Sequence, residues 1–475
     1  MSGMDRRGFL KGAAGVAAGA AVFTIAGTKT SGKVFGANER LNIGVAGLRG
    51  RGRSHISAYA DMPNVEITWM VDPDTRLLEG RNCNTTTDLR EALADADLDA
   101  ISVASPNHWH SASVILAAQA GKHCFVEKPV SHDMYEGRVA LAAAKKYGVV
   151  VQHGTQRRSD PRYAGVINAI RSGKYGRLVV SHGFACKPRD GIGFTRPTTP
   201  PEWLDWEQWR GHAVLDRHHW EKYVHYDWHW FWETGNGEMN NQGTHQLDVA
   251  FWALDEDQTH PSRVMCLGGR FAWEDHGVTP NSQFAVAEYP NGQYVFFNVR
   301  NANHDGYEHQ VENRFYFEDG GKIIGDTYID KNGAERRVEP EPHNLHPGGN
   351  WGSFINACRA NDPSLSNAGM EVAHLSTLLG HTMNNSYRIG KREPFNAQAG
   401  RFGDNDWANQ EFQKFHEIMR DGVGVPEDGG EYIVGPWLTL DPQTERFVGE
   451  HAEAANQLVK NPRMPGFEIP TPETV

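Results

Sequence analysis

The stretch KHCFVEKPVSHDMYEG, residues 122–137, decides the fold of this chain. Its apolar run at 124–126 predicts a buried strand, which Glu127, Lys128 and Pro129 end before a helical pattern begins. A charged residue in this place lies at the carboxyl edge of its strand, where open α/β sheets bind ligands. Pro129 also favours an extended backbone at Lys128, which directs the ammonium group. We therefore expect Glu127 and Lys128 to belong to a ligand site, and a surface ion pair is the alternative.

Strand and helix patterns alternate on both sides of this stretch. Strand patterns precede it at 41–47, 65–71 and 99–105, and helical patterns flank it at 111–121 and 137–148. Strands separated by helices predict right-handed crossovers and a parallel, doubly wound sheet. The fold class is therefore α/β, with a Rossmann domain expected at residues 37–155.

The first turn of this domain, GLRGRG at 47–52, is the candidate phosphate cradle. Gly47, Gly50 and Gly52 fit the G-x-G-x-x-G pattern, but Arg49 stands at its second glycine position. A plain tight turn is the alternative. Asp72 ends the second strand about 25 residues on, where a ribose-binding carboxylate is expected. The combination predicts NAD, rather than NADP, as the cofactor.

The segment SPNHWH at 105–110 follows another strand at the same edge. A His-x-His pair without a carboxylate nearby is weak support for a metal site, so we expect a loop that lines the cofactor, and no metal. The expected cofactor contacts are Gly47, Arg49, Gly50, Gly52, Asp72, Ser105, Pro106, Asn107, His108, His110, Glu127 and Lys128.

Composition limits the class of partner. The 475 residues are 39% hydrophobic and 22% charged, which is ordinary for a globular protein of two or three domains. A formal charge of −12 argues against a nucleic acid as the main partner, and favours a small neutral or polar substrate. The five cysteines are far apart and lack a CxxC pair, so neither disulfides nor a zinc site are expected.

After residue 151 the alternation stops. Strand-like runs at 176–187, 262–273, 282–300 and 313–329, with Asn-Gly and Gly-Gly turns, predict a mainly antiparallel sheet that is open on one face. We expect a second α/β domain at 156–400 that binds substrate or mediates homo-oligomers. Residues 401–475 are expected to form a C-terminal extension. Its part beyond Gly422, rich in Pro, Gly and Glu, is expected to be an extended strap without chemistry.

An insertion at 187–252 is crowded with Trp, His and Tyr. These rings are either part of a core or the floor of a sugar site, where flat rings meet the apolar faces of pyranoses. The sequence leaves both readings open. The residues expected to contact substrate are Arg158, Tyr226, Trp228, His245 and Asp248.

The candidate acid/base group lies inside this insertion, in NNQGTHQLD at 240–248. If one helix begins near Gly237, then Asn241, His245 and Asp248 share one of its faces. Asp248 would then fix the tautomer of the His245 ring, and Asn241 would position a substrate hydroxyl. We expect Lys128, His245 and Asn241 to be the catalytic residues.

The first 36 residues resemble a twin-arginine export signal. Arg6 and Arg7 precede a charge-free, Gly/Ala-rich run at 12–28, which is too short and too weakly apolar for a convincing membrane span. A membrane anchor is the alternative. We expect export of the folded protein to the periplasm, without a stable membrane span.

The motifs IGVAGLRGRG, SPNHWH, VEKP and QGTHQLD, in this order, resemble those of the glucose-fructose oxidoreductase/inositol dehydrogenase (Gfo/Idh/MocA) family over residues 41–401. The resemblance implies an NAD(P)-binding Rossmann domain and a second α/β domain. It places the family's lysine on Lys128 and its acid/base histidine on His245. The family's dehydrogenases commonly carry an aspartate where this chain has Asn241, and an amide cannot accept a proton.

Three functions are consistent with these residues. The leading one is an exported NAD(H)-dependent oxidoreductase that acts on a carbohydrate or polyol by hydride transfer, with a tightly bound cofactor. The second is an NAD-dependent glycoside hydrolase that works by transient oxidation and elimination. The third is a non-catalytic sugar-binding protein.

Overall fold

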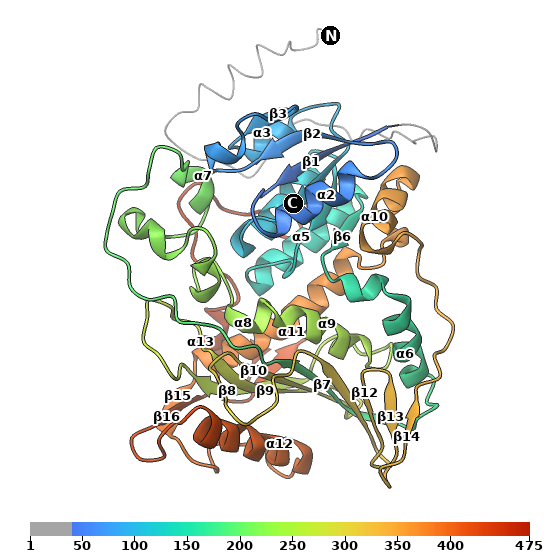
Figure 1. The fold of residues 1–475 in the computed structure, drawn as a ribbon, viewed down its shortest axis with the longest axis vertical. Helices are drawn as coiled ribbons and strands as arrows, with labels where there is room; N and C mark the ends of the chain where they lie inside the picture. The colour runs from blue at the N-terminus through green and yellow to red at the C-terminus, as the bar shows by residue number, and fades with distance from the viewer. Residues whose placement is uncertain (1–39) are drawn as a thin grey trace.

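The computed structural model describes residues 40–475, so the expected export signal at 1–36, with Arg6 and Arg7, lies outside the described residues. The first body is a six-stranded parallel sheet in the order β3-β2-β1-β4-β5-β6. Its strands are β1 (Leu41–Ala46), β2 (Val65–Val71), β3 (Asn84–Thr86), β4 (Ala100–Val103), β5 (His123–Val126) and β6 (Val151–His153). Its helices are α2 (Arg51–Ala60), α3 (Leu89–Leu93), α4 (His110–Gln119) and α5 (Met134–Tyr147). The predicted doubly wound sheet is confirmed (Figure 1).

The second body is a 12-stranded sheet in which β10 and β7 are parallel and the other pairs are antiparallel. Its strands are β7 (Leu178–Ala185), β8 (Arg263–Gly269), β9 (Ser282–Glu288), β10 (Tyr294–Arg300), β11 (Asn313–Phe317), β12 (Lys322–Ile324), β13 (Thr327–Ile329), β14 (Glu335–Arg337), β15 (Lys391–Pro394), β16 (Glu431–Val434), β17 (Leu438–Asp441) and β18 (Arg446–Val448). This mixed, mainly antiparallel sheet is also as predicted.

The remaining helices lie on this sheet, against the first domain or in the insertion. The longer ones are α6 (Pro161–Arg171), α9 (Gly243–Trp252), α10 (Gly349–Ala360), α11 (Met370–Arg388) and α12 (Asp406–Glu417), and the shorter ones are α7 (Trp206–Arg210), α8 (Gly237–Asn240) and α13 (Ala452–Asn456). Short turns of helix lie at η1 (Thr75–Leu77), η2 (Asn107–Trp109), η3 (Gln156–Ser159), η4 (Arg217–Lys222), η5 (Asp227–Trp230), η6 (Pro363–Leu365) and η7 (Ile418–Gly422).

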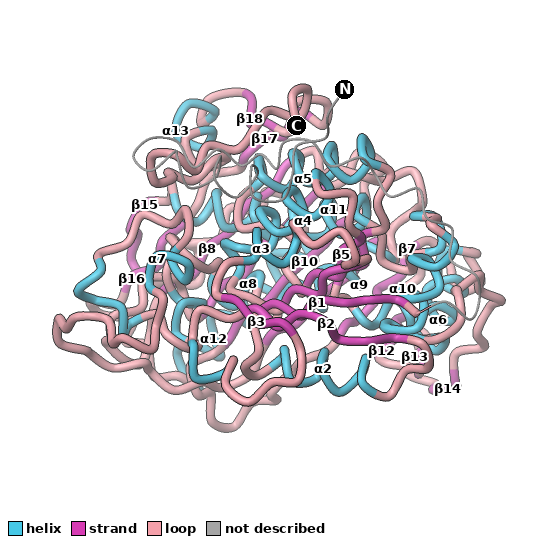
Figure 2. Tube along the Cα trace, turned by 90° about the horizontal axis from the view of Figure 1, so that it is seen from above, coloured by secondary structure: helices cyan, strands magenta, loops and turns pink. Residues whose placement is uncertain are grey.

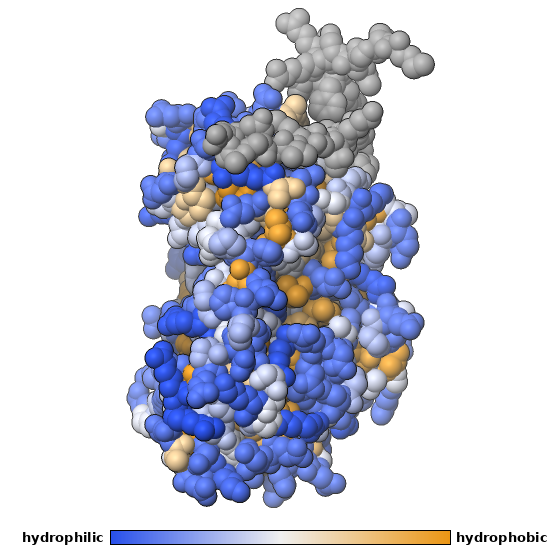
Figure 3. All heavy atoms as spheres, turned by 90° about the vertical axis from the view of Figure 1, so that its right-hand side faces the viewer, coloured by the Kyte–Doolittle hydropathy of each residue, from blue (hydrophilic) through white to orange (hydrophobic). Residues whose placement is uncertain are grey.

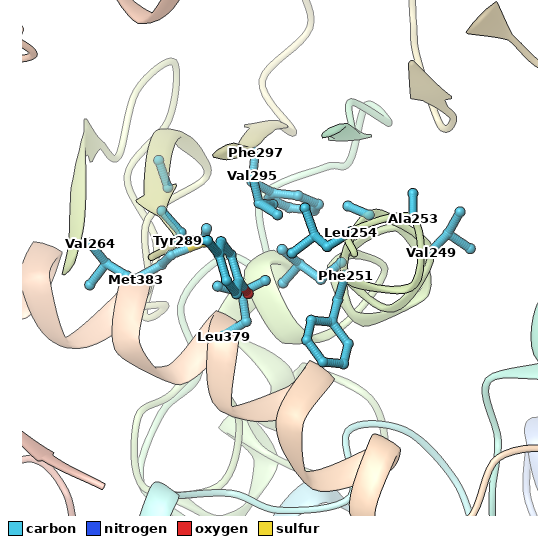
Figure 4. Close-up of a cluster of buried hydrophobic side chains, with 14 of the residues drawn as sticks. Val249, Phe251, Ala253, Leu254, Val264, Tyr289, Val295, Phe297, Leu379 and Met383 are labelled. Atoms are coloured by element: carbon cyan, nitrogen blue, oxygen red, sulfur yellow. The ribbon is translucent and has the colours of Figure 1, made fainter. Parts of the chain in front are cut away.

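The main core lies between this sheet and the helices α9 and α11. Figure 4 shows Val249 and Phe251 of α9 and Leu379 and Met383 of α11 around Phe297 of β10, all buried. These apolar contacts place α8 and α9, and with them His245, between the two sheets (Figure 1).

The expectation of one open sheet face needs correction. Helix α12 packs Phe412 and Phe415 against Phe284 and Phe296, on the face away from α9 and α11 (Figure 1). The apolar spacing of α12 buries these rings, so the chain itself covers part of the outer face. The expected homo-oligomer stays a prediction.

The tail beyond Gly422 is not the expected plain strap, because it contributes β16 to β18 to the large sheet. Beyond α13 the tail binds the start of α5: Tyr135 N–H donates to the Val459 carbonyl (3.0 Å), and Asn461 N–H donates to Asp133 Oδ2 (2.9 Å). Arg463 pairs with Glu136. Figure 2 shows β17, β18, α13 and the C-terminus on one side of the molecule.

The surface is mainly polar. Figure 3 shows one face that is largely hydrophilic, with apolar residues visible near its middle. Within residues 40–475, no helix combines the length and the apolar character that a membrane crossing requires. All five cysteines are free, and four of them are buried.

Candidate functional site

The glycine turn after β1 forms a cradle that side chains would fill. Gly47 has φ +82°, and a Cβ there would lie 2.7 Å from the Ala104 carbonyl. A Cβ on Gly52 would lie 1.8 Å from the Gly47 oxygen. Helix α2 begins at Arg51, directly after Gly50, which offers no capping side chain. These residues fit a pyrophosphate held by backbone N–H groups at a helix N-terminus.

Asp72 lies at the end of β2 and lines the same cavity. Its carboxylate accepts the N–H groups of Leu48 (2.7 Å) and Asp74 (2.9 Å). Burial raises the pKa of Asp72, while these two backbone bonds oppose the rise. The carboxylate is therefore fixed by the backbone, where it can accept a ribose hydroxyl.

Arg49, at the second glycine position, turns towards Asp74. Its Nη2 donates to Asp74 Oδ2 (2.7 Å), which also accepts a bond from Arg76 Nη2 (2.8 Å). Burial alone would raise the pKa of Asp74, but the two guanidinium groups lower it to about 2. Asp74 thus remains charged and holds both arginines at the edge of the cavity.

The two histidines of the loop after β4 contact backbone carbonyls. His110 contacts the carbonyls of Ser105 (2.8 Å) and Pro129 (2.5 Å) through its two ring nitrogens, and His108 Nε2 contacts the Trp209 carbonyl (3.1 Å). Among residues 40–475, no group of three or more His, Cys, Asp or Glu side chains is arranged to hold a metal. The histidines fix the loop that carries Pro106 and Asn107 along the cavity.

Glu127 and Lys128 follow β5 and take different partners. Glu127 Oε1 accepts a bond from Arg51 Nε (2.7 Å) and lies 3.2 Å from His55 Nε2. Lys128 Nζ donates to the backbone oxygen of Asn241 (2.7 Å), with Asn241 Oδ1 at 3.4 Å. Burial lowers the pKa of Lys128, and the charges of Glu127 and Glu238 partly offset that effect. The ammonium group is therefore aimed at the segment that carries His245.

The expected single helix from Gly237 is wrong. Helix α8 ends at Asn240, Asn241 has φ −81° and ψ −90°, and α9 begins at Gly243. The break turns the Asn241 carbonyl out of any helical bond, so that it can accept from Lys128. His245 lies in the first turn of α9 and lines the cavity together with Lys128 and Asn241.

Asp248 does not orient His245, contrary to our expectation. Its two oxygens accept Nε of Arg158 at 2.9 and 3.1 Å, and both side chains are buried. Neither residue lines the cavity, so the structure places Arg158 and Asp248 behind its wall. His245 Nδ1 has no hydrogen-bond partner within residues 40–475. Burial lowers the pKa of His245 well below 6.5, so the resting imidazole is neutral.

Rings of the aromatic insertion lie both in a core and along the cavity, and the sugar-binding floor stays a prediction. Trp206, Trp209, Tyr223 and Phe231 belong to a small buried core. Trp228 belongs to that core and also lines the cavity, where it stacks on His229 with ring centroids 3.5 Å apart. Tyr226, which is 51% exposed, lines the cavity as well.

Most of the expected site residues border one cavity of about 570 Å³. Contrary to expectation, Gly52, His108, Arg158 and Asp248 do not line it. It runs from the glycine turn and Asp72 to Lys128, Asn241 and His245, and Tyr226 and Trp228 form part of its wall. This volume is within the range of pockets that bind small molecules and cofactors.

Comparison with known proteins agrees with this geometry. Residues 41–155 match the oxidoreductase family model with the NAD-binding Rossmann fold, and residues 212–321 match the GFO/IDH/MocA C-terminal domain. Over these two segments the chain is similar to the Gfo/Idh/MocA family. Its first domain is an NAD-binding Rossmann domain.

Several proteins that are similar to this chain are sugar or polyol dehydrogenases. Levoglucosan dehydrogenase of Pseudarthrobacter phenanthrenivorans is 29% identical over 158 residues, 30% of this chain and 40% of the relative. The scyllo-inositol 2-dehydrogenase (NAD(+)) of Bacillus subtilis is 30% identical over 155 residues, 30% of this chain and 44% of the relative. The chain thus spans less than half the length of these curated relatives.

A solved structure shares the fold. The WlbA dehydrogenase from Bordetella pertussis, in complex with NADH and UDP-GlcNAcA, aligns with a TM-score of 0.53 and 20% identity. The alignment covers 74% of this chain and 97% of that chain.

Two features of the site were missed in the sequence. Arg189 and Glu238 form a buried ion pair beside Asn241, and the only local signal was the spacing of three residues between Glu238 and Asn241. The insertion also binds the first domain beside Asp74: Thr75 N–H donates to the Trp203 carbonyl (2.9 Å), and Asp205 N–H donates to the Pro73 carbonyl (2.8 Å). Such contacts between distant segments leave no periodic pattern.

Proposed function

We propose that this protein is an exported NAD(H)-dependent oxidoreductase that acts on a neutral carbohydrate or polyol. The observation that carries the proposal is that Lys128 and His245 line one end of the cavity that begins at the glycine turn and Asp72. A substrate hydroxyl between these groups can donate its proton to the neutral His245 ring while Lys128 donates a hydrogen bond to its oxygen. Bound NAD would accept the hydride from the adjoining carbon.

The charges of the cavity support a neutral substrate. Two arginines that line the cavity are already paired, Arg49 with Asp74 and Arg51 with Glu127. Arg189, outside the lining, is paired with Glu238. A substrate carboxylate or phosphate would have to compete with these buried carboxylates for a guanidinium partner. Tyr226 and Trp228 offer the flat apolar surface that suits a sugar ring.

The test is a panel of neutral sugars, polyols and the corresponding sugar acids, with nicotinamide reduction followed by absorbance. We expect neutral sugars or polyols of the panel to reduce the NAD, and the corresponding sugar acids to reduce it more weakly. If no neutral sugar or polyol reduces the nucleotide at any concentration, the proposed function is wrong.

The protein should bind NAD at least about tenfold more tightly than NADP, a difference of about 1.4 kcal/mol. Asp72 is held by two backbone N–H groups and lines the cavity, and a fixed carboxylate accepts a ribose hydroxyl but repels a phosphate. Titration of nucleotide-free protein with both cofactors measures the ratio. Asp72→Asn should reduce the ratio, whereas Asp61→Asn, on the exposed end of α2, should not. Equal or tighter binding of NADP to the wild type contradicts this assignment.

The pH profile of kcat/KM should be bell-shaped and broad. His245 must be neutral to take a proton, and because burial lowers its pKa well below 6.5, activity should fall only in acid well below pH 6.5. Lys128 must be protonated to donate, and because burial lowers its pKa, activity should fall again before pH 10.5. Initial rates across the stable pH range check both limbs. An acid limb at or above pH 6.5 would exclude His245 as the base.

Export bears on how the cofactor is used. The twin-arginine route carries folded proteins, and the periplasm offers no dependable pool of free NAD, so we propose that NAD is bound before export and retained. The bonds from Trp203 and Asp205 to the end of β2 support retention, because they tie the insertion to the first domain at the edge of the cavity. Arg76 also stacks on Trp203, 3.5 Å from the ring centroid.

A retained cofactor has to be regenerated in place. We therefore propose that each oxidation is balanced by a reduction on the same enzyme. The balance involves either two different sugars, or one substrate that is oxidised and reduced again during glycoside cleavage. The second cycle is the alternative function, NAD-dependent glycoside hydrolysis.

A further inference from the structure

Glu238 is a fully buried carboxylate beside the proposed catalytic groups. It lies in α8 with 0% of its surface exposed. Arg189, in the segment after β7, binds it through two parallel bonds: Nε donates to Oε2 and Nη2 donates to Oε1, both at 2.8 Å. Such a bidentate pair fixes the carboxylate in position as well as neutralising it.

The same carboxylate fixes the amide of Asn241. Asn241 Nδ2 donates to Glu238 Oε2 at 3.2 Å, and both side chains are buried. A carboxylate can only accept hydrogen bonds, so it selects the orientation in which the amide nitrogen faces Glu238. Asn241 Oδ1 is then left facing Lys128 Nζ, at 3.4 Å.

The Lys128 ammonium group thereby faces two oxygen atoms of Asn241, one of the backbone and one of the side chain. It donates to the Asn241 carbonyl at 2.7 Å and lies near Oδ1. An ammonium group has three donors, so one remains for a substrate oxygen in the cavity. At the other end of the network, Arg189 Nη1 donates to the hydroxyl of Tyr226, which lines the cavity wall (3.3 Å).

These contacts also explain why residue 241 suits an amide. An aspartate there would set two carboxylates against each other in a buried place, where neither could donate without taking up a proton. The donor of Asn241 and the acceptor of Glu238 are complementary, so the two positions form a matched pair.

We propose that Glu238 and Arg189 are positioning residues, which orient Lys128 through the amide of Asn241 and link that orientation to Tyr226 on the substrate wall. The inference rests on the proposed function for its kinetic consequence. Its structural part, the control of Lys128 by Glu238, does not depend on any substrate.

The kinetic test compares the holoenzyme with Glu238→Gln, Asn241→Asp and the double variant. Each single change should lower kcat about tenfold or more, with a smaller change in KM. In the double variant, the introduced glutamine can donate to the introduced aspartate and still accept from Arg189, so kcat should be about tenfold higher than in Asn241→Asp alone. Losses in the double variant that equal the product of the single losses would overturn the proposal.

A second measurement needs no turnover. The charged groups around Lys128 are Glu127, Glu238, Arg189 and Arg51. Removing the Glu238 charge should lower the pH midpoint for acetylation of Lys128 by acetic anhydride, mapped by mass spectrometry. Asp275→Asn, which breaks a comparable buried pair with Arg270 away from the cavity, is the matched control and should leave the midpoint unchanged. Equal midpoints in wild type and Glu238→Gln would overturn the proposal. If the wild type oxidises no carbohydrate, the proposed function fails, while this measurement still decides the inference.

Discussion

Replacing Lys128 by alanine should lower turnover by about 10²- to 10⁴-fold, while the protein keeps its nucleotide. The ammonium group is the donor aimed at the substrate end of the cavity, and Asn241 holds it there. The nucleotide is expected to be held mainly by the glycine turn and Asp72, at the other end of the cavity. His245→Ala should behave similarly, because it removes the proposed proton acceptor. Steady-state rates and nucleotide content, measured on the same preparations, check both statements.

The matched control is Lys145→Ala. Lys145 lies in the last turn of α5 with 60% of its side chain exposed, and it pairs at the surface with Glu371. Its replacement should leave turnover and nucleotide content unchanged. Turnover at the wild-type level in Lys128→Ala or His245→Ala would remove the role assigned to that residue.

The purified protein should contain nearly one nucleotide per chain, and extensive dialysis should not remove it. At an association rate of about 10⁶ M⁻¹s⁻¹, a dissociation constant on the order of 10 pM corresponds to an off-rate of about 10⁻⁵ s⁻¹, slow enough for retention over hours. Mass spectrometry and absorbance of the denatured protein measure the content before and after dialysis. Trp203→Ala, which removes the ring under Arg76, should speed the loss of nucleotide, and Trp407→Ala, on the far sheet face, should not.

Deuterated water separates the two proposed redox cycles. Oxidation next to a C–H group acidifies that proton, so glycoside cleavage by elimination leaves deuterium in the released sugar. Hydride exchange between two sugars does not require this incorporation. Protein that purifies empty, needs millimolar added NAD and accumulates NADH with product would be an ordinary dehydrogenase without a closed cycle.

The first domain could be predicted because its signals are local. Strands β2 and β5 are short, mainly apolar runs that end directly before functional residues, Asp72 and Glu127 respectively. The cradle needs glycine because Gly47 has a positive φ and because the backbone approaches Gly52 too closely for a side chain. Parallel strand order then brings these ends to one edge without further information.

The second half of the site could not be predicted to the same depth. The spacing of Asn241, His245 and Asp248 is helical, yet the helix is interrupted at Asn241. The Asn241 carbonyl instead accepts a hydrogen bond from Lys128, which is 113 residues away in the sequence. The Asp248 carboxylate accepts a hydrogen bond from Arg158, which is 90 residues away in the sequence. Contacts of this kind depend on tertiary packing, which local periodicity does not encode.

The tail after α13 bears on how the two sheets can move relative to each other. Val459, Asn461 and Arg463 bind the start of α5 in the first domain, and Met464 N–H donates to the His212 carbonyl in the insertion (2.9 Å). A hinge opening between the domains would have to break all of these contacts together. We therefore expect the two domains to keep their relative position when a substrate binds. X-ray scattering profiles with and without substrate should accordingly superimpose.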